Sequence, residues 1–552
     1  MAERTEWTLQ IEGMTCDHCA KTIDETLRRV PGVVDTATSY PDRRARVVTE
    51  ASVEGAKLAG EIAGTGKGYR VIGHSSRKLR VERSPGDEEL DLAVVGGGSA
   101  GFAAAIRAAD LGASAAIIEG GALGGTCVNV GCVPSKTLIR AAEVFHRAGH
   151  HAFAGIRAKL ERPDFHAIIK QKDELVAELQ QVKYWDVLAA YPSVMLVKGK
   201  ATFRDDGTLL VDGKPLRARK VVLAMGSSPW APPIPGLDST PHLTSTEALS
   251  LPELPKTLIA IGASAVGLEI AQLLARLGVK VTVLEALPRI VPAEDADIGE
   301  ALVAYLREEG MNLHPGVAVR RVSGKPGAYK VEVEEGGKAN TFEAEQLLVA
   351  TGRRANTKGI GLEEAGIRLG KKGEVVVDEH LETARKGIYA AGDVAGDPMF
   401  VYVAAYAGSL AAENALNGNA RKYDLAVVPR VTFTDPGVAS VGLTEAQARE
   451  RGIAVAVSKL PLSYVPRAIA ARDTRGLIKL VADEKTDLLV GAHILAPEAG
   501  EMVQAAAMAI RFAIRADEIA AMLHPYLTHA EGLKLACQTF KKDVAKLSCC
   551  AA

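Results

Sequence analysis

The stretch from Gly124 to Lys136 reads GGTCVNVGCVPSK, with two cysteines five positions apart among small residues and a lysine four positions after the second. Two thiols at this spacing, Cys127 and Cys132, can close a disulfide, bind a soft metal ion or exchange electrons with a neighbouring cofactor. Which of these three chemistries applies depends on the rest of the chain.

Composition and length set broad limits on the protein. A chain of 552 residues is too long for one core and predicts three or four domains. Its net charge of -1 gives no sign of a nucleic-acid footprint. No apolar run reaches the roughly 18 residues of a membrane helix, and the N-terminus lacks the features of a signal peptide. We therefore expect a cytoplasmic protein with no nucleic-acid partner and no stable membrane association.

Six of the seven cysteines form close pairs that lie far apart in the sequence. The pairs are Cys16 with Cys19, Cys127 with Cys132, and Cys549 with Cys550. This density is too low for a secreted disulfide scaffold, so reactive or metal-binding thiols in a reducing compartment fit better. The seventh cysteine, Cys537, lies in a helical pattern and is expected in the core.

The N-terminal segment has the pattern of a ferredoxin-like βαββαβ unit. Residues 7–11 alternate apolar and polar side chains, and apolar residues between 20 and 30 recur at helical spacing. Strands around 33–38, 46–49 and 69–72 and a helix near 53–63 complete the order. Residues 75–89 are charged and aperiodic, which predicts a flexible tether.

Cys16 and Cys19 lie on the loop that enters the first predicted helix, where the helix dipole and free amides stabilise thiolates. Two thiolates suit a soft ion of low coordination, such as Hg(II) or Cu(I). A bare Cys-x-x-Cys is equally a redox motif. The whole segment, including the GMTCxxC motif, resembles the heavy-metal-associated domain, and this resemblance favours a metal site.

Residues 91–119 have the pattern of a dinucleotide-binding unit. A short apolar strand leads into GGGSAG at 96–101, and an alanine-rich helix and a second strand ending in Glu119 follow. Gly96 permits the turn, Gly98 admits the pyrophosphate, and Gly101 lets helix and strand pack closely. Glu119 can hold a ribose diol. Ala100 belongs to the same cofactor-binding turn.

The pattern recurs at residues 258–285, where GASAVG at 262–267 keeps Gly262 and Gly267 but has Ser264 in place of the middle glycine. A serine is small enough to fit. Two such sites imply two dinucleotides, most simply FAD and a nicotinamide coenzyme. Glu285, at the end of the second strand, can accept from a free 2′-hydroxyl and would repel a 2′-phosphate. Taken alone, this acid favours NADH over NADPH.

Two later glycine turns also fit a flavin. ATGR at 350–353, with Gly352, and AAGDV at 390–394 each follow a buried strand. Asp393, beside Val394, is placed to bind the ribityl or phosphate portion.

From about Asp91 to Phe540 the chain resembles the pyridine nucleotide-disulfide oxidoreductases of the glutathione reductase and lipoamide dehydrogenase type. The resemblance implies that Cys132 contacts the flavin and Cys127 exchanges with substrate. Lys136 and Glu269 match the family's ion pair beside the flavin N5, and a buried pair of this kind can orient the ring. We also assign Gly125 and Thr126 to the flavin site.

The implied organisation is an α/β chain with two Rossmann-like dinucleotide-binding domains, an α+β dimerisation domain and the ferredoxin-like metal-binding domain in front. The expected bounds are 1–74 for the heavy-metal-associated domain, 75–89 for the linker, 90–251 and 381–426 for the FAD-binding domain, 252–380 for the NAD(P)-binding domain, and 427–552 for the dimerisation domain with its Cys-Cys tail.

The C-terminal segment departs from the disulfide reductase pattern His-Pro-Thr-x-x-Glu, whose histidine shuttles protons from the partner subunit. Here residues 524–531 read HPYLTHAE. His524 invites assignment as the base, but aligning Thr528 and Glu531 with Thr-x-x-Glu puts Tyr526 at the histidine position, and we favour this registration. Tyrosine is a poor base at neutral pH, yet it can donate a hydrogen bond or guide a metal. Tyr184, on a helix expected to begin near Asp173, is a candidate counterpart.

Over its full length, including Tyr526 and the terminal Cys549 and Cys550, the chain resembles the mercuric reductases. The resemblance implies a homodimer in which NAD(P)H reduces FAD and electrons pass to Hg(II) held by Cys127 and Cys132. The terminal dithiol of the partner subunit would take Hg(II) from thiol complexes or from Cys16 and Cys19. A thioredoxin reductase-like enzyme would need the histidine. A metal chaperone with a vestigial flavoenzyme body would not need intact nucleotide motifs. Family resemblance favours NADPH, against the indication from Glu285.

Overall fold

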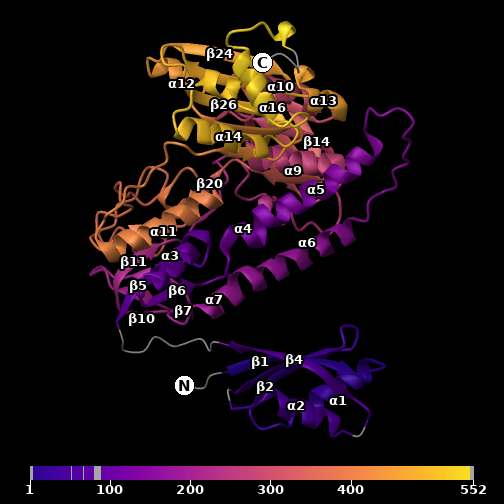
Figure 1. The fold of residues 1–552 in the computed structure, drawn as a ribbon, viewed down its shortest axis with the longest axis vertical. Helices are drawn as coiled ribbons and strands as arrows, with labels where there is room; N and C mark the ends of the chain where they lie inside the picture. Colours follow the sequence, from indigo (N-terminus) through magenta and orange to yellow (C-terminus); the bar gives the residue numbers. More distant parts are fainter. Residues whose placement is uncertain (1–3, 51, 66, 80–88, 548–552) are drawn as a thin grey trace.

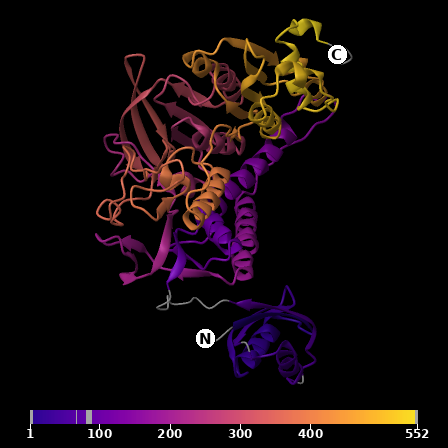
Figure 2. The same ribbon diagram turned by 60° about the vertical axis from the view of Figure 1, so that its left-hand side comes forward.

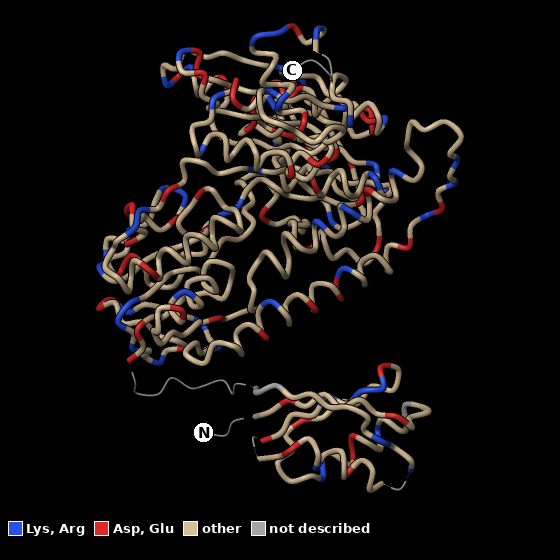
Figure 3. The backbone as a smooth tube through the Cα atoms, viewed as in Figure 1, with Lys and Arg blue, Asp and Glu red and all other residues tan. Residues whose placement is uncertain are grey.

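The computed structural model describes residues 4–50, 52–65, 67–79 and 89–547 (Figures 1 and 2). Acidic and basic residues are interspersed along the chain (Figure 3). In the described part, no helix is both long enough and apolar enough to cross a membrane.

The N-terminal domain has the predicted βαββαβ order. Its elements are β1 (Arg4–Glu12), α1 (Asp17–Arg28), β2 (Val33–Ser39), β3 (Arg44–Glu50), α2 (Gly55–Ala63) and β4 (Arg70–Leu79). The strands form an antiparallel sheet in the order β2-β3-β1-β4. Leu9, Ile23 and Leu58 are fully buried between this sheet and the helices.

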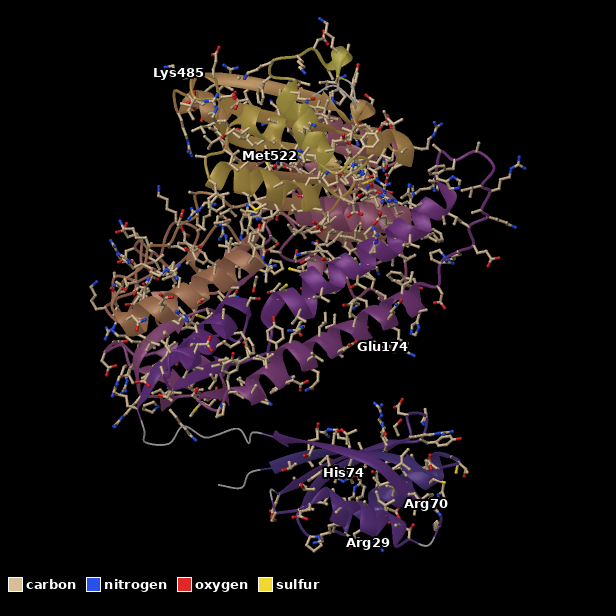
Figure 4. All side chains as sticks on the ribbon, viewed as in Figure 1. Arg29, Arg70, His74, Glu174, Lys485 and Met522 are labelled. Carbon is tan, nitrogen blue, oxygen red and sulfur yellow. The ribbon has the colours of Figure 1, made fainter. Side chains whose placement is uncertain are left out.

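The predicted linker begins too early. β4 continues through residues 75–79, where Ser75 pairs with Thr8 and Leu79 with Arg4 of β1. A neighbouring strand that offers hydrogen-bonding partners turns this charged segment into sheet edge, although its sequence has no apolar stripe. His74, labelled on β4 in Figure 4, lies edge-on to the ring of Trp7, 5.6 Å between centroids.

The first dinucleotide domain is built on a parallel sheet in the order β21-β11-β5-β6-β7. Its strands are β5 (Leu90–Val95), β6 (Ala115–Glu119), β7 (Val194–Lys198), β11 (Ala218–Leu223) and β21 (Ile388–Ala390). β21 lies far along the chain yet pairs with β11, so the chain leaves this domain and returns to it. α3 (Ser99–Asp110) packs closely on α11 (Val401–Asn417), because a Cβ on Gly408 would lie only 1.9 Å from the Ala100 carbonyl oxygen.

Four helices lie between β6 and β7 in the chain, and the first two contain the cysteine stretch. They are α4 (Gly125–Val130), α5 (Cys132–Gly149), α6 (Phe165–Gln180) and α7 (Asp186–Ala190), and a π-helical turn (Gln181–Trp185) joins the last two. α6 begins at Phe165 rather than near Asp173, because the Asp164 carboxylate caps the helix by accepting from Ala167 N at 3.0 Å. Smaller strands follow: β8 (Ala201–Phe203), β9 (Leu209–Val211), β10 (Lys214–Pro215) and β12 (Ser227–Pro229).

The second dinucleotide domain repeats the strand–helix–strand unit, after the short helix α8 (Ser245–Ala248). Its parallel sheet, β15-β14-β13-β19, is formed by β13 (Thr257–Ile261), β14 (Lys280–Glu285), β15 (Asn312–Pro315) and β19 (Gln346–Val349). Its helices are α9 (Ala265–Arg276) and α10 (Ala296–Glu308), and an antiparallel sheet joins β16 (Ala318–Lys325), β17 (Ala328–Glu335) and β18 (Lys338–Ala344). β20 (Arg353–Ala355) then pairs with β12 of the first domain.

The C-terminal domain is a five-stranded antiparallel sheet, β22-β23-β26-β25-β24, with helices against it. The strands are β22 (Arg430–Thr432), β23 (Gly437–Gly442), β24 (Val455–Pro461), β25 (Leu477–Asp483) and β26 (Leu489–Ala496); the helices are α12 (Glu445–Glu450), α13 (Pro466–Ala471), α14 (Ala499–Arg511), α15 (Ala516–Ala521) and α16 (Glu531–Gln538). Cys537 is 4% exposed in its core, which confirms the expectation for this residue.

Candidate active site and metal-binding site

The two cysteines of the central stretch stand at the starts of consecutive helices. Cys127 lies in the first turn of α4, and Cys132 is the first residue of α5. Gly131 forms the break between the helices, and a Cβ there would come within 2.8 Å of the Thr126 carbonyl oxygen. Asn129 fixes the entry to α4 by donating to Leu123 O at 3.1 Å and Gly125 O at 2.8 Å. The local backbone geometry therefore brings two thiols that are five positions apart in the sequence into one site.

The two thiols have opposite electrostatic environments. A hydrogen bond from Cys127 lowers the pKa of Cys132 to about 7 against the opposing effect of burial, and the Lys136 ammonium adds to this lowering. The same hydrogen bond, together with burial, raises the pKa of Cys127 above its usual range. Cys132 also stands at the N-terminus of an 18-residue helix, which favours negative charge. The singly deprotonated pair therefore has its thiolate on Cys132 and its proton on Cys127.

Lys136 and Glu269 form an ion pair beside the cysteines. The Lys136 Nζ lies 2.7 Å from a Glu269 carboxylate oxygen, and the glutamate side chain is only 6% exposed. Lys136 follows Cys132 by one turn of α5, whereas Glu269 belongs to α9 of the second dinucleotide domain. Both line a cleft of about 200 Å³ that opens between α5, α9 and the C-terminal domain.

Phe433 contacts both members of this ion pair. The sequence analysis did not assign it to the site. Its backbone N–H donates to the second Glu269 oxygen at 2.9 Å, and the Lys136 Nζ lies 4.6 Å from its ring centroid. No local pattern marks Phe433, because its partners come from two other domains. Three domains thus meet at the lysine.

Tyr184 lies at the same site. Its place on the π-helical turn fits the frequent occurrence of such turns at functional positions. Its ring packs edge-on against Phe102 at 4.9 Å, and a Cβ on Gly124 would lie 3.3 Å from it. Burial raises the pKa of Tyr184, and the charges of Cys127 and Cys132 raise it further. The tyrosine therefore keeps its proton next to this pair of thiols.

The first glycine turn has the geometry of a dinucleotide cradle. A Cβ on Gly96 would lie 2.4 Å from Ala224 O, and one on Gly101 would lie 1.9 Å from Gly96 O. Gly125 approaches so closely that its Cβ would lie 2.7 Å from the Gly98 Cα, which places the cysteine stretch against the turn. Glu119 accepts from Gly97 N at 2.6 Å and from Gly121 N at 2.6 Å. The residues fit a bound dinucleotide.

The segment around Asp393 closes the same cradle. Asp393 lies in a 3-10 helical turn, Gly392–Ala395, that includes the buried Val394. A Cβ on Gly392 would lie 2.9 Å from the Ala100 Cβ, so this turn sits on the first turn of α3. The Asp393 carboxylate accepts from the Ser227 hydroxyl at 2.6 Å, which in turn accepts from Arg353 at 2.7 Å.

Gly352 precedes this arginine with φ of +126°, a backbone conformation that favours glycine. Ser227 and Arg353 are polar partners that the sequence analysis did not assign.

The second glycine turn copies the first. Cβ atoms on Gly262 and Gly267 would lie 2.5 Å from Ala350 O and 2.1 Å from Gly262 O. Ser264 has φ and ψ of -87° and -173°, close to -77° and -173° at Gly98. The serine thus adopts the backbone of the glycine it replaces, and its side chain is exposed.

The N-terminal domain holds a separate pair of thiols. The sulfur atoms of Cys16 and Cys19 are 3.8 Å apart at the start of α1, with Cys16 exposed and Cys19 buried. Hydrogen bonds from Thr15 and from Tyr69 lower the pKa of Cys19 to about 6. Tyr69 is 5% exposed, and this bond raises its own pKa to about 12. The tyrosine was missed because it reads as an ordinary apolar strand residue.

Comparisons with known proteins agree over the whole chain. The family model described as pyridine nucleotide-disulphide oxidoreductase matches residues 90–408, that of its dimerisation domain residues 428–537, and that of the heavy-metal-associated domain residues 8–68. The mercuric reductase of Staphylococcus aureus is 42% identical over 99% of this chain and 100% of its own length. That of Acidithiobacillus ferrooxidans is 43% identical over 100% of both chains. The chain belongs to the mercuric reductase family.

A solved structure supports the fold assignment of this mercuric reductase family member. The Cu(II) complex of the HOCl-induced flavoprotein disulfide reductase RclA from Escherichia coli matches with a TM-score of 0.72 and 32% identity, covering 80% of this chain and 98% of that one. Mercuric reductases and their relatives use FAD and NAD(P)H, and these are the cofactors of this chain. The match to a dimerisation domain indicates a homodimer.

The segment that would reach the partner subunit's site is only partly described. Tyr526 lies on the loop between α15 and α16 and is 56% exposed. Glu531 accepts from Leu527 N at 3.3 Å, and its own N–H donates to the Thr528 hydroxyl at 3.2 Å, which fixes the loop. Met522 (labelled in Figure 4) and Leu523 precede Tyr526 in this loop, and Leu523 is 98% exposed. Cys549 and Cys550 lie outside the described residues.

Proposed function

We propose that the protein reduces Hg(II) to volatile Hg(0) with electrons from NAD(P)H and so serves mercury detoxification and resistance. The observation that carries this proposal is the Cys127–Cys132 pair, which has one depressed thiol pKa and lies beside the Lys136–Glu269 ion pair and the first dinucleotide cradle. When bound, FAD supplies the two-electron carrier between the nicotinamide and the metal.

Cys127 and Cys132 hold the substrate. Hg(II) is a soft ion that accepts two thiolates, and Cys132 is the thiol of the pair that ionises first. Hg(II) arrives with two thiolate ligands, and both are exchanged for Cys127 and Cys132. One ligand takes the proton of Cys127 and leaves as a thiol, and the other leaves as a thiolate. Uptake of two electrons converts Hg(II) to Hg(0), which has no charge to bind thiolates, so the atom leaves and both cysteines remain reduced. In the resting protein the pair can instead close as a disulfide.

Lys136 and Glu269 orient the reacting groups. The ammonium supplies positive charge next to Cys132, and the buried carboxylate fixes its position. The assigned turn residues, Gly96, Gly98, Ala100, Gly101, Glu119, Gly125, Thr126, Gly352, Asp393 and Val394, would hold FAD, and Gly262, Gly267 and Glu285 would hold the nicotinamide coenzyme.

Delivery of Hg(II) uses the remaining thiols. Cys549 and Cys550 of the partner subunit would take Hg(II) from thiol complexes in solution or from Cys16 and Cys19. Each transfer trades one bis-thiolate complex for another, which keeps a soft ion bound and mobile. Tyr184, and Tyr526 of the partner subunit, would guide the ion at the inner site. Thiol-bound Hg(II) as substrate favours the cytoplasm, where thiols are abundant.

The decisive experiment compares electron acceptors. We expect NAD(P)H oxidation with HgCl2 in excess thiol, and release of Hg(0) into a gas-phase trap. Thioredoxin and oxidised lipoamide should give little turnover. Turnover with a disulfide but not with Hg(II) would show a disulfide reductase instead.

The Cys549→Ala/Cys550→Ala double variant should lose most turnover of thiol-bound Hg(II), and unchanged kinetics would exclude the relay.

A further inference from the structure

We propose that Glu285 makes this protein select NADH over NADPH. The proposal rests on the proposed function only in taking the second dinucleotide site as the place where the reducing coenzyme binds. It assigns a specificity-determining role to one buried carboxylate, and its test can fail separately from Hg(II) reduction.

Glu285 occupies the same place in the second unit as Glu119 in the first. Each acid is the last residue of its strand, β14 or β6. Glu119 accepts from the backbone N of Gly97, and Glu285 accepts from the equivalent Ala263 N at 2.7 Å. Each also accepts from the amide two residues further on, Gly121 at 2.6 Å and Leu287 at 2.8 Å. The two sites therefore present a carboxylate in the same geometry.

This geometry fits a ribose with a free 2′-hydroxyl. Glu285 is 8% exposed and each of its oxygens receives one amide N–H, which holds the side chain in a single orientation. A carboxylate offers about four acceptor positions, so two remain for ribose hydroxyls. An acid at the end of this strand is the residue that reads the ribose diol in such units.

A 2′-phosphate at the same place would meet a fixed negative charge. The phosphate itself carries roughly -1.5 to -2 charges at neutral pH, and a like charge in a partly desolvated site is strongly unfavourable. Ala286, Leu287 and Pro288 follow the acid, and their side chains have no donor for a phosphate. Arg289 is the first cation of this turn, and it is half-buried.

Selection of NADPH is the competing possibility, because Arg289 carries a positive charge. In the described part of the chain it forms no ion pair, and it lies four residues after Glu285, so it is the cation that would bind a 2′-phosphate here. Serving that role requires the coenzyme to tolerate Glu285, whose position two backbone amides fix. The fixed acid outweighs the arginine, and the site selects NADH.

Calorimetric binding of NAD+ and NADP+ to the oxidised, FAD-loaded dimer tests this without turnover. We expect the Kd of NAD+ to be at least about tenfold lower than that of NADP+, the scale of hydrogen bonds to a charged group. Glu285→Ala should weaken NAD+ binding and bring the two values to within about threefold. In that variant, adding Arg289→Ala should weaken the NADP+ binding that remains. Glu343→Ala, an exposed acid on β18, is the matched control and should change neither Kd.

Tighter binding of NADP+ by the unaltered protein would overturn the proposal, and so would an unchanged ratio in Glu285→Ala. Glu285→Gln keeps one acceptor for the backbone amides and serves if the alanine variant is unstable; its ratio should also fall. Hg(II)-dependent turnover is measured separately with each coenzyme. Preferential NAD+ binding without Hg(II) turnover would refute the proposed function and leave the coenzyme assignment intact.

Discussion

The Lys136 ammonium lies 4.6 Å from the centre of the Phe433 ring while it pairs with Glu269 at 2.7 Å. Phe433 also donates its backbone N–H to the same glutamate. One residue of the C-terminal domain therefore holds both members of an ion pair whose partners come from two dinucleotide domains. The dimerisation domain thus shapes the candidate active site of its own protomer.

Phe433→Leu should reduce the efficiency of Hg(II) reduction without abolishing it. Loss of a cation–π contact costs about 0.5–2 kcal/mol, which corresponds to a fall in kcat/KM of roughly twofold to thirtyfold. Phe433→Tyr keeps the ring and should restore most of the activity. Phe153→Leu, a partly exposed aromatic of the loop after α5, is the matched control. Equal losses in the leucine and tyrosine variants would show that the ring itself does not position Lys136.

Arg276→Met should destabilise the contact between the second dinucleotide domain and the C-terminal domain. Arg276 is 5% exposed, binds Glu309 through two hydrogen bonds of 2.9 and 2.6 Å, and reaches Asp435 at 2.9 Å. Removing one partner of a buried ion pair costs about 3–5 kcal/mol, and Arg475, which remains, should keep the loss near the lower value. Urea unfolding at pH 7 measures it. Arg320→Met breaks an exposed pair with Glu334 and should cost less than about 1 kcal/mol.

The same network predicts the pH dependence of stability. Burial alone would raise the pKa of Asp435, but Arg276, Arg475 and Arg147 outweigh it and hold the pKa below 3.8. A carboxyl with a depressed pKa stabilises the fold fully above its unfolded value and loses this contribution as pH falls through its folded value. The difference in unfolding midpoint between the unaltered protein and Arg276→Met should therefore be constant from pH 6 to about pH 5 and narrow below about pH 4. A gap that widens on acidification would contradict this assignment.

Local signals in the sequence were sufficient for the nucleotide cradles. Gly101 and Gly267 are each required by a close approach to a carbonyl oxygen of the same turn, that of Gly96 or Gly262, so the spacing of the glycines alone reveals the turn. The βαββαβ order of the first domain was predictable for the same reason, because apolar periodicity is local. Ser264 weakened the second motif in sequence, yet its backbone angles match those of Gly98.

Contacts between distant segments could not be predicted in this way. Phe433 and Tyr69 carry no motif, and each matters through a partner in another element. The end of β4 was predicted as linker because it is charged and has no apolar pattern. It is a strand only because it pairs with β1. The start of α6 was placed too late because the capping signal of Asp164 precedes a mixed apolar pattern. Apart from the start of the linker, the domain bounds stay predictions, and so do the roles assigned to individual site residues.

Reduced Cys132 should react with iodoacetamide as a thiol of pKa about 7. Its alkylation rate should rise as pH increases through this value and level off above it, because the thiolate is the nucleophile. Cys127→Ala should raise the midpoint, because the Cys132 thiolate then loses the hydrogen bond that Cys127 donates to it. Mass spectrometry assigns the modified residue. Cys537, whose pKa burial raises to about 12, should stay unmodified and is the internal control. Faster modification of Cys127 than of Cys132 would reverse the assignment of the thiolate.

Tyr69→Phe should make the N-terminal thiol pair a weaker competitor for Hg(II) at low pH. The phenol donates a hydrogen bond to Cys19 and helps to lower its pKa to about 6, so its loss should move the pKa back towards the ordinary value of 9.0. A thiol must lose its proton to bind the metal, and the affinity difference between variant and parent should therefore grow as pH falls below 7. Alkylation of Cys19 against pH gives the pKa, and competition with a thiol chelator gives the affinity. Tyr40→Phe, in the turn between β2 and β3, is the matched control. Identical Cys19 profiles for Tyr69→Phe and the unaltered protein would show that the hydrogen bond contributes nothing to metal capture.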